Sequence, residues 1–125
     1  MSSTREIGSQ FESQALQWLM SRVSTKAPLK LIARNFSVRG GELDLVFEQW
    51  LESGDLELVV VEVRGRLQGS WVGGLESVDA FKRRKMKRAL TAFLLKYEGL
   101  AASIRIDVMA WDGREWMYVR DAVEL

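Results

Sequence analysis

The stretches GELDLV (residues 41–46) and VVEVR (residues 60–64) each place acidic residues in an otherwise apolar run. The alternation in the first run and the β-branched residues in the second predict two β-strands, the second apolar on both faces and therefore central. A carboxylate in such a strand is unfavourable unless it is paired, bound to a cation or placed at an accessible margin of the sheet. The two stretches therefore predict a sheet that carries an acidic site.

Two helices and three further strands are predicted around these two strands. Apolar residues recur at helical spacing over residues 5–23, and again from a cap at Ser77 or Asp79 to about Tyr97. Strand-like runs cover residues 29–36, 42–48, 58–63, 104–111 and 115–119. The order α-β-β-β-α-β-β predicts an α/β fold, and the length suits a single domain over residues 1–125.

The composition excludes several kinds of chemistry. The 125 residues include no cysteine and no histidine, which excludes disulfides, thiolate nucleophiles and imidazole bases or metal ligands. Any catalysis must then use carboxylates, lysine and arginine. No apolar segment approaches the ~20 residues of a membrane helix, and the first residues lack the apolar core of a signal peptide, so we expect a cytoplasmic protein with no membrane span.

Positive charge is concentrated in one short segment. The formal net charge is +1, yet KRRKMKR at residues 82–88 holds six basic residues among seven. A local patch of this kind attracts polyanions whatever the net charge. We expect weakly sequence-selective phosphate contacts from the following residues: Arg34, Arg39, Arg66, Arg83, Arg84, Lys85, Lys87 and Arg88. The alternative is a solvated helix face.

Each predicted helix also places one charge within its apolar stripe, Glu12 in the first and Lys82 in the second. An inward carboxylate and an inward ammonium could converge with the acids of the sheet in one polar pocket. If the strand register sets Asp44 beside Glu62, their oxygens could hold a hard divalent cation such as Mg²⁺ or Mn²⁺. The alternative is that both helix charges lie near helix starts and reach water.

Several of these positions match a known family. They are Gly8, Glu12 and Ala15, then ARNF at 33–36, GELDL at 41–45, VEVRGR at 61–66, Val78 with KRR at 82–84, and RIDV at 105–108. In this pattern, which spans nearly the whole chain, the sequence resembles the YraN-like family of small bacterial proteins. That family is similar to Holliday-junction resolvases and to PD-(D/E)xK nucleases. The resemblance implies a restriction-endonuclease-like core, in which helices flank a mixed β-sheet.

The resemblance also implies a function. It implies a metal-dependent endonuclease that cleaves DNA phosphodiester bonds, branched DNA being one conceivable substrate and a homodimer one conceivable assembly. Asp44 and Glu62 would bind Mg²⁺ or Mn²⁺, Glu12 would assist from the first helix, and position 64 would carry the lysine of the motif. The Glu12, Asp44 and Glu62 positions all keep their carboxylates.

One position departs from the motif, because this chain has Glu62-Val63-Arg64 where the motif has Glu-x-Lys. Arginine can stabilise charge on a phosphate, but its very high pKa makes it a poor base. Three interpretations stay open. The cation could activate water without a lysine while Arg64 clamps the phosphate. Lys82 could supply the missing ammonium. The protein could also be a catalytically inactive nucleic-acid-binding module. The retained carboxylates favour a metal-dependent site.

Overall fold

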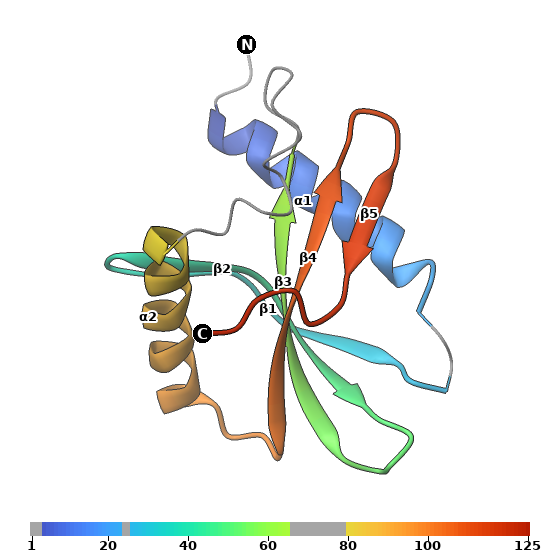
Figure 1. Ribbon diagram of the computed structural model, residues 1–125, viewed down its shortest axis with the longest axis vertical. Coiled ribbons are helices and arrows are strands. Elements are labelled where there is room, and N and C mark those ends of the chain that lie inside the picture. Colours follow the sequence, from blue (N-terminus) through green and yellow to red (C-terminus); the bar gives the residue numbers. More distant parts are fainter. Residues whose placement is uncertain (1–3, 24–25, 66–79) are drawn as a thin grey trace.

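A computed structural model describes residues 4–23, 26–65 and 80–125. Its elements are α1 (Thr4–Met20), β1 (Leu29–Val38), β2 (Gly41–Trp50), β3 (Leu56–Arg64), α2 (Ala80–Lys96), β4 (Ser103–Trp111) and β5 (Trp116–Val119). The five strands form one sheet in the order β1-β2-β3-β4-β5. Only β3 and β4 pair in parallel, and the other neighbours are antiparallel. The predicted α/β fold, a mixed sheet with two helices, is confirmed (Figure 1).

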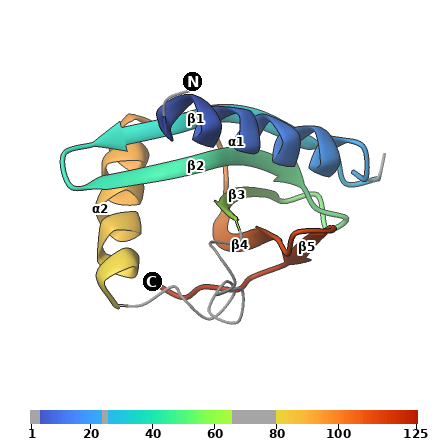
Figure 2. The same ribbon diagram turned by 90° about the horizontal axis from the view of Figure 1, so that it is seen from above.

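The central strand β3 separates two apolar clusters. Leu58 and Val60 pack in the cluster that includes Met86 of α2, whereas Val59 and Val61 pack in the cluster that includes Ala15 and Leu19 of α1. Since successive side chains of a strand point to opposite faces, the two helices cover opposite faces of β3. Figure 2 shows α1 lying along β1 and β2 while α2 stands beside the far end of the same hairpin.

Helix α2 packs directly on the backbone of the β1–β2 hairpin. A Cβ atom at Gly41 would lie 3.0 Å from the backbone nitrogen of Ala89 and would collide with the carbonyl oxygen of Lys85. The adjacent Gly40 has a φ of 82°, in the left-handed region that favours glycine. The glycine pair at 40 and 41 therefore forms the turn and admits α2 at close range, which brings the part of α2 from Lys85 to Ala89 near the start of β2.

Strand β2 does not keep a strict alternation of faces. Leu43 packs in the α2 cluster and Leu45 in the α1 cluster, although residues two apart in a regular strand share a face. In the β1–β2 register Arg34 pairs with Leu45 and Phe36 with Leu43, which sets Asn35 opposite Asp44. Asn35 has a φ of 53°, a left-handed conformation that asparagine tolerates better than most residues. The side chains of β2 thus switch from the α2 face to the α1 face of the sheet at Asp44, so Asp44 lies within reach of side chains from both helices.

The predicted elements all correspond to observed ones, with differences at their ends. The first helix ends at Met20 rather than at residue 23. Beyond it, Ser21 Oγ donates a hydrogen bond of 2.7 Å to the Trp18 carbonyl oxygen, and such a side-chain bond to a terminal carbonyl ends a helix early. The caps predicted at Ser77 or Asp79 lie outside the described residues. Neither described helix is both long enough and apolar enough to cross a membrane.

Candidate metal centre

Asp44 and Glu62 lie side by side on the central strands. Leu45 pairs with Val61 in the antiparallel β2–β3 register, so the next step along the ladder sets Asp44 opposite Glu62. The two side chains share a hydrogen bond. Asp44 Oδ2 also accepts a 2.9 Å bond from the backbone N–H of Val63. The sheet therefore fixes the Asp44 carboxylate from the β3 side and leaves its remaining lone pairs for other partners.

Two further carboxylates approach Asp44 from α1 and from the start of β2. The side chains of Glu12, Glu42 and Asp44 each offer an oxygen, and these oxygens all lie within 4.8 Å of one another. Asn35 bonds to the Glu12 side chain and so positions it. Glu12 is half-buried and Glu42 is exposed. The site therefore has a buried end at Glu62 and an open end at Glu42.

Two oxygens of this cluster lack any hydrogen-bond partner among the described residues, although both are buried. They are Oε2 of Glu12 and Oε1 of Glu62, and the Glu62 side chain as a whole is only 9% exposed. Buried polar atoms without partners are rare in folded proteins, because each loses its hydration without compensation. Orphaned carboxylate oxygens are what a hard cation would bind, so the donor set fits Mg²⁺ or Mn²⁺.

The electrostatics of the cluster agree with this fit. Burial raises the pKa of Glu62 well above its usual range, and the charge of Asp44 raises it further. Burial also raises the pKa of Asp44, against the Val63 N–H bond that lowers it. The pKa of Glu12 is raised by burial and then by Asp44. Such mutually repelling carboxyl groups are typical of functional sites, and a divalent cation would relieve the repulsion.

Two cationic side chains from different elements act on Asp44. The positive charges of Arg64, at the end of β3, and of Lys82, in the first turn of α2, both lower the pKa of Asp44. Arg64 has the same effect on Glu62. Of the two interpretations of Lys82, the one in which it reaches water holds, since its side chain is exposed. It stands where the first turn of α2 reaches solvent, and its charge still reaches the carboxylates.

The predicted nucleic-acid contacts on α2 form an exposed surface. The exposed basic residues there are Arg83, Arg84, Lys85, Lys87 and Arg88. Three of them, Arg84, Lys87 and Arg88, line a groove of about 330 Å³ together with Thr91. Within the described residues no carboxylate forms an ion pair with these three side chains. The groove therefore presents to solvent positive charge that no carboxylate of the described residues neutralises by an ion pair.

The other predicted contacts lie elsewhere. Arg39 is exposed in the β1–β2 turn. Arg34 is half-buried instead, and its Nη2 donates a 2.6 Å bond to Ser13 Oγ of α1. Its positive charge lowers the pKa of Glu12, so Arg34 belongs to the surroundings of the carboxylates rather than to an outer surface. Arg66 lies outside the described residues.

Two residues of the cluster, Asn35 and Glu42, were not predicted from the sequence as site residues. Glu42 carried a visible signal, because it is two residues from Asp44 on the same strand and so was expected on the same face. Asn35 carried a weaker one, an amide side chain in the middle of a predicted strand, where asparagine is disfavoured.

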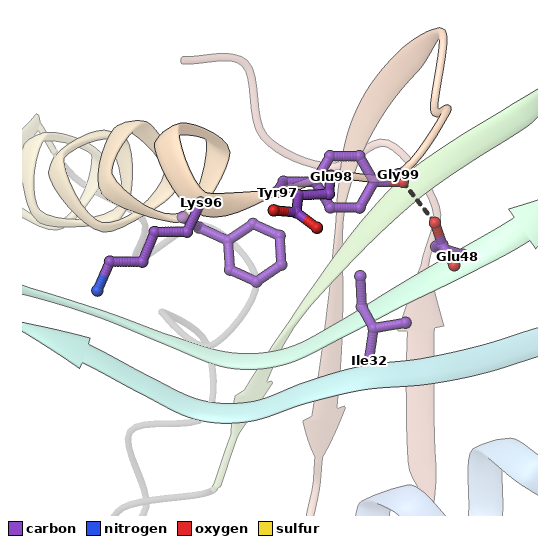
Figure 3. Close-up of a pocket in the computed structure, with 7 residues that line it drawn as sticks. Ile32, Glu48, Lys96, Tyr97, Glu98 and Gly99 are labelled. Atoms are coloured by element: carbon purple, nitrogen blue, oxygen red, sulfur yellow. Dashed lines mark hydrogen bonds between the residues drawn. The ribbon is translucent and has the colours of Figure 1, made fainter.

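The cavity at the other end of α2 is separate from this cluster. It measures about 300 Å³ and is lined by Ile32, Glu48, Phe93, Lys96, Tyr97, Glu98 and Gly99. Figure 3 shows Tyr97, just beyond α2, pointing at Glu48, to which its hydroxyl donates a hydrogen bond. This bond ties the end of α2 to β2, so the arrangement serves packing.

A second group of charges, within the RIDV stretch, is also structural. Asp107 is fully buried and accepts bonds from Arg105 Nε at 3.1 Å, from the Tyr118 hydroxyl and from the Asp121 N–H at 2.7 Å. Arg105 also pairs with Glu57 at 2.7 Å. The Arg105–Asp107 pair lies within β4, and the other contacts join β4 to β3, to β5 and to the segment after β5, so the network holds the C-terminal part of the chain against the sheet.

Comparison with known proteins identifies the family. The model of Uncharacterised protein family UPF0102 matches residues 11–111. A UPF0102 protein of Burkholderia pseudomallei (strain 1710b) is 40% identical over 120 residues, which are 96% of this chain and 76% of the relative. A UPF0102 protein of Burkholderia thailandensis is 38% identical with the same coverage. The resemblance to the YraN-like family is confirmed, and the chain belongs to UPF0102, the YraN family.

Proposed function

We propose that this protein is a metal-dependent nuclease that hydrolyses phosphodiester bonds of DNA. The observation that carries the proposal is that Glu12 and Glu62 each lie beside Asp44 with one buried carboxylate oxygen that has no hydrogen-bond partner among the described residues. These carboxylates would hold Mg²⁺ or Mn²⁺. The positive charges of Arg64 and Lys82 act on the same point.

The divalent cation, when bound, supplies Lewis-acid stabilisation of phosphate oxygens and lowers the pKa of water. The protein's own groups hold the carboxylates in position. The Val63 N–H holds the Asp44 carboxylate at a fixed point of the sheet. Asn35 holds Glu12 beside it. Arg64 is suited to clamp the scissile phosphate, because a guanidinium binds phosphate oxygens in pairs.

Lys82 contributes in a different way. Its exposed ammonium lies in the first turn of α2, the helix that carries the basic groove, and its charge acts on Asp44. A strand whose phosphates contact the outer surface of α2 would thus meet positive charge as it approaches Asp44. Preorganised charge of this kind stabilises the negative charge that builds up on a phosphate during hydrolysis.

A second candidate function is a nucleic-acid-binding module without catalysis. Two observations favour it: arginine stands at position 64, where the motif has lysine, and Arg84, Lys87 and Arg88 of the groove form no ion pair with a carboxylate in the described part of the chain. Such a module would bind phosphates through these side chains, with a steep dependence on salt concentration. The carboxylates would then be a remnant of the fold.

A cleavage assay separates the two functions. Fluorescent duplex, nicked, branched and single-stranded DNAs are incubated with the protein in Mg²⁺, in Mn²⁺ and in chelator, beside the Asp44→Asn variant. Cleavage that requires the cation and is lost in the variant supports the nuclease. Restoring the motif with Arg64→Lys should increase the rate, because lysine can orient and help activate water. Salt-sensitive binding without cleavage by either protein supports the binding module.

A further inference from the structure

Glu42 is not among the metal ligands expected from the sequence. Its carboxylate lies with those of Glu12 and Asp44 in a set whose oxygens are all within 4.8 Å of one another. That spacing is close to the separation of oxygens that share one cation, since Ca²⁺, Mg²⁺ and Mn²⁺ take oxygen ligands at roughly 2.0–2.6 Å. Val61 and Val63 pack in the cluster that includes Ala15 of α1, so Glu62 between them points to the other face of β3, where it is buried and hydrogen-bonded to Asp44. Asp44 therefore has carboxylates on two sides.

We propose that Glu42 is a metal ligand and that Glu12, Glu42 and Asp44 form an outer cation position on the solvent side of Asp44. This rests on the proposed function, because it concerns the same carboxylates, and it adds a ligand and a location to it. Asp44 would be shared between the outer position and the buried side at Glu62.

The orphaned oxygens point to a ligand independently of the acidic cluster. Glu12 Oε2 belongs to the outer position and Glu62 Oε1 to the buried side, and both are buried without a hydrogen-bond partner in the described part of the chain. Glu62 is more than nine-tenths buried and is bonded to Asp44. One orphaned oxygen thus lies on each side of Asp44, which is the arrangement that cation binding on both sides would satisfy.

The exposure of Glu42 gives it a distinct role. Glu62 is buried and Glu12 is half-buried, whereas Glu42 is exposed, so the outer position opens to solvent at Glu42. A cation there can keep water ligands and exchange them for phosphate oxygens of a substrate, as magnesium sites in phosphoryl chemistry do. The nearby positive charge of Arg34, which lowers the pKa of Glu12, opposes cation binding. The carboxylate of Glu42, the third in the cluster, offsets this positive charge.

The experiment measures cation binding without any substrate. Calorimetric titration with Mn²⁺ is compared for the wild type, Glu42→Gln, Glu42→Asp and the control Glu52→Gln, which removes one exposed carboxylate in the loop after β2. We expect Mn²⁺ affinity to fall at least ten-fold in Glu42→Gln, since even residues behind the ligands change metal affinity by roughly 10–100-fold. Glu52→Gln should match the wild type.

Glu42→Asp separates ligation from simple attraction. The substitution keeps the negative charge and shortens the side chain. If Glu42 is a ligand, Glu42→Asp should also bind Mn²⁺ more weakly than the wild type does. If Glu42 only attracts the cation through its charge, Glu42→Asp should bind Mn²⁺ as tightly as the wild type does. Europium(III) luminescence lifetimes in H₂O and D₂O give a second readout, because they count bound waters. More waters on the ion in Glu42→Gln, and not in Glu52→Gln, support ligation.

The outcomes for Glu42 and for the proposed function are distinct. If Asp44→Asn abolishes Mn²⁺ binding while both Glu42 variants bind as the wild type does, the outer position is refuted and the carboxylate site stands. If the wild type binds neither Mn²⁺ nor europium(III), the outer position and the metal site of the proposed function are both refuted. Weakened binding in both Glu42 variants, with more waters in Glu42→Gln, supports the proposal.

Discussion

Replacing Glu62 by glutamine should stabilise the metal-free protein at neutral pH. Glu62 is buried beside Asp44, and one of its oxygens has no partner among the described residues. Its pKa is raised by burial and by Asp44, so at a pH between the ordinary and the raised pKa the folded protein holds a proton there that the unfolded chain releases. Glutamine has the shape of the protonated acid and can donate to Asp44 in its place. At neutral pH the Glu62→Gln variant should therefore have the stability that the wild type has in acid, where Glu62 is protonated.

The sign and size follow from proton linkage. A raised pKa in the folded state means that stability is full below the ordinary pKa of 4.5 and falls as pH rises toward the raised value. For a single proton the slope is at most about 1.4 kcal/mol per pH unit. Glutamine removes this loss. For a chain of this length each kcal/mol corresponds to roughly 3–5 °C in Tm, so between the ordinary and the raised pKa the variant's advantage should grow by at most roughly 4–7 °C per pH unit.

Thermal unfolding measured from pH 4 to 8 in chelator provides the assay, with Glu52→Gln as a control for removal of an exposed carboxylate. We expect the Tm of Glu62→Gln to equal that of the wild type near pH 4 and to exceed it increasingly toward neutral pH. Added Mn²⁺ should raise the Tm of the wild type by more than that of the variant, because a ligand that binds the folded state stabilises it and the variant has lost one carboxylate of the site. A variant that is less stable than the wild type at every pH would refute the reasoning.

Three further predictions concern other parts of the molecule. Gly41→Ala should destabilise by about 1–3 kcal/mol, because its Cβ would meet the backbone of α2; urea unfolding measures this, and an unchanged midpoint would contradict the packing. Tyr118→Phe should cost roughly 1–3 kcal/mol by removing one partner of buried Asp107, while leaving Mn²⁺ affinity unchanged; a loss of Mn²⁺ affinity would show that the network reaches the site. Replacing Arg84 and Lys87 with alanine should weaken DNA binding and reduce the slope of log affinity against log salt by roughly 2; fluorescence anisotropy at several salt concentrations tests it, and an unchanged slope would exclude this groove as the phosphate contact.

The fold was predictable because each element carries its own pattern. The alternation of GELDLV and the β-branched run before Arg64 identify β2 and β3. The few residues between these strands, Leu51–Asp55, lead back through a short turn. That short connection is why Asp44 and Glu62 lie opposite each other once the strands pair.

The rest of the candidate site depends on backbone conformations that pattern does not encode. Alternation through Glu42, Asp44 and Val46 assumes a regular strand, whereas β2 changes face at Asp44, opposite the left-handed Asn35. The choice between an inward and an exposed Lys82 stayed open for a related reason. A helical stripe identifies the residues in line with the core, but it does not say how far the sheet extends beneath the first turn of the helix.

The central claim is that the carboxylates around Asp44 bind a divalent cation. The most direct measurement is anomalous X-ray scattering from crystals grown with Mn²⁺, for the wild type and for Asp44→Asn. We predict an anomalous peak within about 2.0–2.6 Å of an Asp44 carboxylate oxygen, with Glu12, Glu42 or Glu62 as a further ligand, and no such peak in the variant. A wild-type crystal at saturating Mn²⁺ with no peak among these four side chains would contradict the claim.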